Sequence, residues 1–194
     1  PHTGEALHVI YNLKSNNTVN SSHTELYLQD TYRTESKAGI LSINYGARLS
    51  HWTWNGEWLF SPRACLGYVP AANDAFTFRL ATGLYYQRPF YKELRDTVTT
   101  DGNTVVQLNK DIKSQRSFQI LTAMEYKFKL ADRPFKFSTE LYYKAQSRLN
   151  PYNVDNVKIV YYGNNCASGY VIGADFKLYG EFVPGTDSWI SFGL

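Results

Sequence analysis

The segment FTFRLATGLYYQ, residues 76–87, decides the fold class, because the polarity of its side chains alternates at every residue. The even-numbered positions are apolar or aromatic apart from Thr82, whereas the odd-numbered positions include Arg79, Gly83 and Gln87. A period of two places successive side chains on opposite faces of a β-strand. This segment is therefore predicted to be a strand with one apolar face and one polar face.

The same alternation recurs along most of the chain. It is clear over residues 38–50, 116–130, 135–144 and 168–179, and weaker over residues 5–14, 24–33 and 57–69. No segment has a comparable helical period, so we expect an all-β chain. Pro62 lacks an N–H group, and it predicts a bulge in the strand that contains it.

The connections between these segments alternate between short and long. Short turns of the type TESK, PAAND, ADRP and VPGTDS follow Arg33, Val69, Leu130 and Phe182, whereas the other connections are longer on average and more polar. Within the long loop after residue 87, Asp101-Gly102 predicts a small hairpin. This pattern predicts one antiparallel up-and-down domain with about 8–9 strands, in which all short turns lie at one end.

Composition excludes several classes of protein. The 194 residues include 16 Tyr, 11 Phe and 4 Trp, and aromatic residues favour strands. The net charge is only +3 and the basic residues are scattered, so no nucleic-acid partner is expected. No apolar run is long enough for a transmembrane helix, but hydropathy does not exclude a membrane barrel.

Motifs for catalysis and metal binding are also missing from the sequence. The four His residues lack metal-ligand spacing, and no pattern of nucleophile and base is visible. We therefore expect no enzymatic activity and no cofactor. Cys65 and Cys166 do not form a C-x-x-C pair, and two free thiols are favoured over a disulfide.

Alternation alone leaves two barrels open, a soluble one with its apolar face inside and a membrane barrel with that face outside. Three features favour the membrane barrel: strands long enough to cross a bilayer, a polar face that mixes charged and small residues, and aromatic residues near strand ends. The aromatic residues in question are Trp52, Trp54, Trp58, Tyr68, Tyr86, Tyr143, Tyr170 and Trp189. Since a membrane tolerates no open sheet edge, residues 1–194 are expected to be part of a larger transmembrane β-barrel.

Residues 57–94 add a specific resemblance. The strand EWLFSPRACLGYVP, a short turn and FTFRLATGLYYQRPFYKEL resemble the barrel signature of TonB-dependent outer-membrane receptors. The matching positions are Ser61, Pro62, Arg63, Arg79, Gly83, Tyr86, Pro89 and Glu93. The stretch NPYNVDNVKIVYYGNNCASGYVIGADFKLYGEFVPGTDSW is similar to the version found in Bacteroidetes-type receptors. The resemblance implies a fragment of the C-terminal barrel, and we expect the plug domain and the TonB box outside residues 1–194.

The function that the resemblance implies is active transport across the bacterial outer membrane. Such a receptor binds an extracellular solute and imports it to the periplasm with energy from the TonB–ExbB–ExbD complex. The barrel contacts outer-membrane lipid, and a surface lipoprotein is a further candidate partner. Siderophore, haem, vitamin, glycan and peptide all remain open as the solute. A passive porin or adhesin barrel and a soluble β-barrel ligand-binding module remain the alternatives.

Two groups of residues are candidate sites. The expected lumen- or plug-facing residues are Arg48, Arg63, Arg79, Glu125 and Glu140. The expected substrate-binding residues of the extracellular loops are Arg88, Tyr91, Lys92, Glu93, Tyr152 and Asn153. Glu125 and Glu140 lie on facing strands of a predicted hairpin, where a charge ladder with Lys127 and Lys136 is favoured over a functional carboxylate pair.

Overall fold

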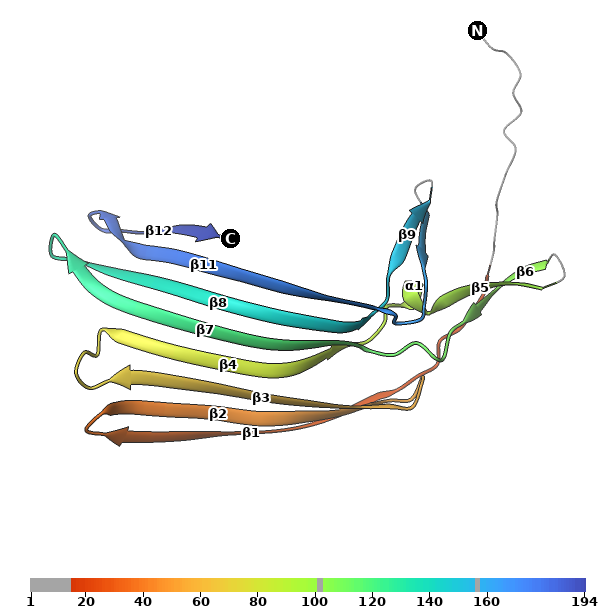
Figure 1. Ribbon diagram of the computed structural model, residues 1–194, viewed down its shortest axis with the longest axis horizontal. Helices are drawn as coiled ribbons and strands as arrows, with labels where there is room; N and C mark the ends of the chain where they lie inside the picture. The colour runs from red at the N-terminus through yellow and green to blue at the C-terminus, as the bar shows by residue number, and fades with distance from the viewer. Residues whose placement is uncertain (1–14, 101–102, 156–157) are drawn as a thin grey trace, which may run out of the picture.

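The computed structural model describes residues 15–100, 103–155 and 158–194, and these ranges are almost entirely antiparallel β-structure (Figure 1). One sheet holds eight strands in the order β1-β2-β3-β4-β7-β8-β11-β12. Their bounds are β1 His23–Ser36, β2 Gly39–Trp52, β3 Glu57–Pro70, β4 Phe76–Gln87, β7 Gln115–Leu130, β8 Arg133–Leu149, β11 Ala167–Val183 and β12 Thr186–Gly193. Each strand pairs with its neighbour along the chain, apart from two inserted hairpins. The predicted fold class, a partial up-and-down β-barrel, is confirmed.

The register between strands keeps the apolar side chains on one face and the polar side chains on the other. A row of directly opposed apolar-face residues runs across seven strands through Tyr32, Ile43, Leu66, Leu80, Thr122, Leu141 and Ala174. The next row, on the other face, runs across all eight strands through Arg33, Ser42, Gly67, Arg79, Ala123, Glu140, Asp175 and Gly193. The sheet is therefore two-faced over its full width.

The apolar face exposes large hydrophobic side chains, which is unfavourable in water. Leu28 is 79% exposed and Ile172 is 72% exposed, and they lie at opposite sides of the sheet. A soluble protein rarely exposes a contiguous apolar surface of this size. This face requires a non-aqueous medium or a covering layer.

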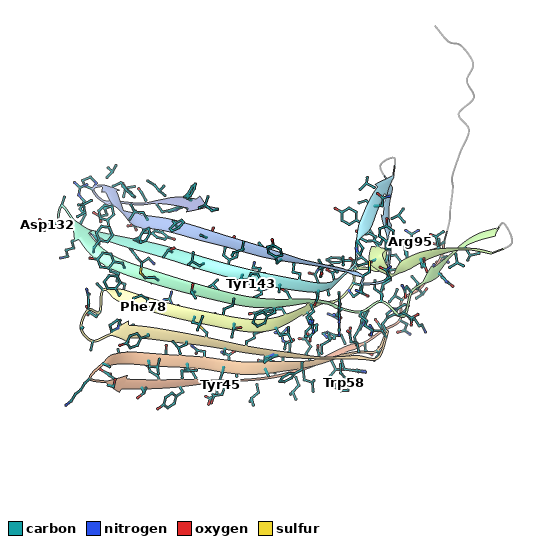
Figure 2. The ribbon with its side chains drawn as sticks, viewed as in Figure 1. Tyr45, Trp58, Phe78, Arg95, Asp132 and Tyr143 are labelled. Carbon is teal, nitrogen blue, oxygen red and sulfur yellow. The ribbon has the colours of Figure 1, made fainter. Side chains whose placement is uncertain are left out.

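The width of the apolar face matches the thickness of a bilayer. On β3 the face runs from Trp58, near the long-loop end, to Tyr68, near the short-turn end. Ten residues at about 3.3 Å each, tilted by about 40°, cover about 25 Å along the membrane normal, which is the height of the apolar band in outer-membrane barrels. Figure 2 shows Trp58 and Phe78 towards these two ends of the sheet.

Stacked aromatic rings line the apolar face at the short-turn end. Phe76 stacks on Tyr126 with 4.4 Å between ring centroids, Tyr126 on Phe128 at 5.4 Å and Phe128 on Phe135 at 5.7 Å. Phe182 completes the series by packing edge to face against Phe135, with 5.3 Å between ring centroids. Aromatic residues are enriched at this depth of membrane barrels because their rings suit the lipid–water interface.

Three of the eight predicted interfacial aromatics lie elsewhere, so the prediction was wrong for them. Trp52 lies on the polar face and is buried, while Trp54 lies in the following turn and packs against it. Trp189 is opposite Tyr179 on the polar face. Proximity to a strand end does not settle which face a side chain occupies, since one residue of shift reverses it.

Asp30 is a charged side chain within the apolar face. It lies on the edge strand β1, directly opposite Tyr45, whose hydroxyl group donates a hydrogen bond of 3.0 Å to the Asp30 carboxylate. This bond satisfies one carboxylate oxygen where no water would be available in a bilayer.

The predicted short turns are confirmed, and they lie together at one end of the sheet (Figure 1). Ala131 and Asp132 connect β7 to β8 with φ angles of 51° and 61°. Two successive positive φ angles define the type I′ turn that suits the twist of a hairpin. Between β11 and β12 the turn residues are Pro184 and Gly185, and Gly185 has a φ of 73°.

The opposite end carries two hairpins that project beyond the sheet (Figure 1). One is β5 Arg95–Thr100 paired with β6 Asn103–Leu108, preceded by the short helix α1 Tyr91–Leu94. The other is β9 Tyr152–Asp155 paired with β10 Lys158–Tyr161. The first confirms the hairpin predicted around Asp101-Gly102, although the turn itself lies outside the described residues, as does the predicted segment 5–14.

The bulge predicted at Pro62 is absent, and that prediction was wrong. The register between β2 and β3 runs without a shift through the Ala47–Pro62 pair. The ladder between β3 and β4, by contrast, ends at the Arg63–Gly83 pair, next to Pro62. A missing N–H at the end of a ladder removes no interstrand hydrogen bond, so no bulge is needed.

Candidate functional site

All five residues predicted to face the lumen lie on the polar face of the sheet (Arg48, Arg63, Arg79, Glu125 and Glu140). Arg79 forms an ion pair with Glu125 across β4 and β7, with 2.7 Å between guanidinium nitrogen and carboxylate oxygen. Lys127 and Lys136 lie directly opposite each other in the next pair along the same face, as the charge ladder considered for Glu125 requires. Glu140 instead lies between Ala123 and Asp175, so two carboxylates are adjacent on this part of the face.

A groove of about 640 Å³ opens on the polar face of β1 to β4, at the long-loop end. Arg48, Arg63 and Arg88 line it together with Ser50 and Ser61. A second hollow of about 270 Å³ adjoins it further along the same strands and shares the lining residues Arg48, Ser61 and Arg63. The register explains this meeting, because Arg48 lies directly opposite Ser61.

The position of Arg63 depends on an aromatic ring and a glycine. The guanidinium carbon of Arg63 lies 4.7 Å from the centroid of the Tyr85 ring, a cation–π contact. Gly83, directly opposite Arg63, leaves the space for that ring, since a Cβ atom at position 83 would lie 2.9 Å from ring atoms of Tyr85. Tyr85 thus supports Arg63 from one side. The N–H groups of the Arg63 guanidinium remain available to other partners.

A small hydrophobic cluster fixes the long loops above the groove. Trp52, Leu94 and Ile112 are buried together, and Trp54 and Leu108 pack against them. These residues come from the end of β2, the following turn, α1, β6 and the segment before β7. The loops at this end therefore form a packed layer, at least where the structure describes them.

Glu57 at the start of β3 is the polar centre of this layer. One carboxylate oxygen accepts hydrogen bonds of 3.0 Å from the backbone N–H of Ser114 and of 3.5 Å from the amide of Asn55. The other oxygen lies 3.6 Å from the Arg148 guanidinium group. Glu57 thereby connects the start of β3 to the segment before β7 and to the end of β8, which are both far away in the sequence.

Two asparagines that the sequence did not single out fasten the loops to the sheet. Asn165 accepts a hydrogen bond of 2.7 Å from the N–H of Lys113 and donates to the carbonyls of Lys113 and Arg148 at 2.9 and 2.8 Å. Asn150 accepts a hydrogen bond of 2.7 Å from the N–H of Gly163. The signal in the sequence was the Gly-Asn-Asn run, because Asn tolerates the left-handed conformation, and Asn165 has a φ of 50°.

The six predicted substrate-binding residues do not form one cluster. Arg88 is exposed and lies at the groove with Arg48, whereas Tyr91 and Lys92 are exposed on α1. Tyr152 and Asn153 are exposed on the separate β9–β10 hairpin, where Tyr152 packs against Tyr161 at 5.8 Å between centroids.

Glu93 has a structural role instead of a place on the loop surface. It is only 6% exposed. One carboxylate oxygen accepts a hydrogen bond of 2.7 Å from the backbone N–H of Phe90, and the other accepts one of 3.3 Å from the Gln115 amide. Because both oxygens are engaged within the chain, we assign Glu93 to the architecture of the loop layer.

Several kinds of site are not found in the part of the chain that the structure describes. Within residues 15–100, 103–155 and 158–194, no group of three His, Cys, Asp or Glu side chains is placed to hold a metal ion. Both Cys65 and Cys166 are free thiols. None of the described helices has the length and apolar character needed to span a membrane.

Comparison with known proteins gives one match. A family model described as TonB dependent receptor-like, beta-barrel, matches residues 4–192. That family consists of outer-membrane transport receptors, not enzymes, which act with the TonB system. Neither the curated proteins nor the solved structures include a significant match.

Proposed function

Because this chain belongs to the TonB-dependent receptor β-barrel family, we propose that it forms part of the wall of an outer-membrane receptor that imports an extracellular solute. The observation that carries the proposal is the two-faced sheet. Its apolar face continues across the sheet and has the height of a bilayer on β3, and its polar face carries charged residues and open hollows. A soluble binding module would place these faces in the reverse order.

The difference between the two ends of the sheet supports one orientation of the barrel in the outer membrane. Outer-membrane barrels have short periplasmic turns and longer extracellular loops. The short turns of this sheet would then face the periplasm, and the loop layer with its two projecting hairpins would face the medium. In this orientation Arg88, Tyr91, Lys92, Tyr152 and Asn153 are available to an external solute.

In this proposal the polar face of the sheet lines the lumen of the barrel. Arg48, Arg63, Arg79, Glu125 and Glu140 would then meet the plug domain or the water around it. Energy would reach the receptor through the TonB–ExbB–ExbD complex, which acts on a plug and TonB box outside residues 1–194. A Bacteroidetes-type receptor with a surface lipoprotein partner is the specific form that we propose, on the resemblance of residues 150–189.

Two measurements on the full-length protein test this function. The protein should sediment with the outer membrane and migrate faster on gels when unheated, since a closed barrel resists the detergent. Mass spectrometry of spent medium should then show that cells lacking this protein and cells lacking TonB leave the same solute behind. A solute still taken up without TonB would refute active transport and favour a passive porin.

A further inference from the structure

Granting the proposed transport function, we propose that the 640 Å³ groove on β1 to β4 is an anion subsite for the transported solute. The ligand class is an organic oxyanion, meaning a carboxylate, phosphate or sulfate group attached to a ring or hydrocarbon body. The groove holds the anionic group between Arg48, Arg63 and Arg88, above the hydroxyl groups of Ser50 and Ser61.

The floor of the groove includes two small polar side chains. Ser50 and Ser61 are 7% and 6% exposed, and both line the groove. Two serine hydroxyl groups in the same groove are donors that an oxyanion can accept from.

The charge of the groove is positive. Three arginines line it, whereas Glu25 is the carboxylate that lines it among the described residues. Glu25 lies 3.5 Å from Arg48 and 3.3 Å from His23. Arg63 and Arg88 have no carboxylate within 4.0 Å in the described part of the chain. Two unneutralised guanidinium groups with planar donor edges match the geometry of an oxyanion.

Preorganisation strengthens this match. The Tyr85 ring supports Arg63 at 4.7 Å and limits the orientations of its guanidinium plane. Less side-chain entropy is then lost when a ligand binds. By contrast Arg79, on the same face, is already paired with Glu125 at 2.7 Å and offers little to a further anion.

The size and the remaining lining of the groove indicate more than an inorganic ion. Trp52, Leu59 and Phe90 contribute apolar surface beside the arginines. A groove of about 640 Å³ lies within the range of roughly 300–1,000 Å³ that is typical of sites for small organic ligands. An apolar or ring-containing body attached to the anionic group fills this space.

The test is calorimetric titration of the full-length, detergent-purified protein with citrate, inorganic phosphate, sulfate and, as a neutral probe, glucose. At least one of the three anions should bind saturably with one site, and its affinity should fall as sodium chloride is added. Arg63→Gln with Arg88→Gln should weaken binding at least tenfold. Arg33→Gln, an exposed arginine at the turn end of the same face, is the matched control and should leave affinity unchanged.

Each outcome bears on the subsite separately from the transport function. The gel migration of unheated samples first shows whether each variant is a closed barrel. If the double variant does not fold, Ser61→Ala replaces it, since this variant keeps every charge and should still weaken binding by threefold or more. A closed barrel that binds none of the three anions, or that binds glucose as tightly as citrate, would overturn the subsite and leave the transport function standing. Stronger binding of citrate than of phosphate and sulfate would support the subsite and assign it to carboxylates.

Discussion

Two variants, each with one arginine on a different face of β4, should differ in their free energy of unfolding. Phe76 and Tyr86 bound the apolar face of this strand, and Leu80 lies between them. At about 3.3 Å per residue and a tilt of about 40°, the band is about 25 Å high, and Leu80 lies about 10 Å from Phe76. Leu80 is therefore within about 3 Å of the midplane of the bilayer.

Leu80→Arg should lower the free energy of unfolding by about 2–4 kcal/mol, which is the cost of an arginine on the lipid face at the midplane. Ala81→Arg is the matched control, since Ala81 is the next residue, points to the other face and lines the 270 Å³ hollow. It should cost less than about 1 kcal/mol, as surface substitutions usually do.

The assay is reversible denaturation of the full-length protein in lipid vesicles, with the free energy obtained by linear extrapolation in denaturant. Equal costs for the two arginines would contradict the assignment of the faces. A greater cost at Ala81 than at Leu80 would reverse the assignment altogether.

Three further predictions test the site and its supports. Gly83→Val should displace the Tyr85 ring and lower stability by about 1–3 kcal/mol, measured as a lower denaturation midpoint, and an unchanged midpoint would contradict the close packing of ring and glycine. Asn165→Ala should remove three hydrogen bonds and expose the loops to limited proteolysis. Asn165→Gly keeps the φ of 50° accessible and should be cleaved more slowly than Asn165→Ala. Equal cleavage rates for the two variants would refute a role for that conformation. A membrane-impermeant maleimide should label Cys166, in its exposed loop, on intact cells and label Cys65 much more slowly, and labelling of Cys166 only after lysis would invert the proposed orientation.

Periodicity predicted the sheet because local physics determines it. Alternation at residues 76–87 and 116–130 places polar and apolar side chains on opposite faces of any strand, whatever surrounds it. Turn chemistry is equally local, and Pro184-Gly185 and Ala131-Asp132 produced the connections expected of them. These features needed no knowledge of long-range contacts.

The site was less predictable because it depends on register and on loop packing. The sequence indicated Arg48 and Arg63 as polar-face residues, but only the pairing of β2 with β3 brings Ser61 beside them. Glu93 was expected on the surface, but it is buried and accepts a hydrogen bond from Gln115 across a long loop. Asn165 was overlooked for the same reason, since its partners lie far away in the sequence.

The central claim is that lipid meets the apolar face and water meets the polar face, and adjacent residues of β8 test it most directly. Glu140 lies on the polar face and Leu141 on the apolar face. A nitroxide label would be attached to Glu140→Cys and to Leu141→Cys, each in a background with Ser at positions 65 and 166, with the protein in lipid vesicles. The label at Leu141 should collide more with oxygen, which concentrates in lipid, and the label at Glu140 more with a water-soluble nickel complex. The reverse accessibilities, or equal ones, would contradict the account of this protein as part of a membrane barrel.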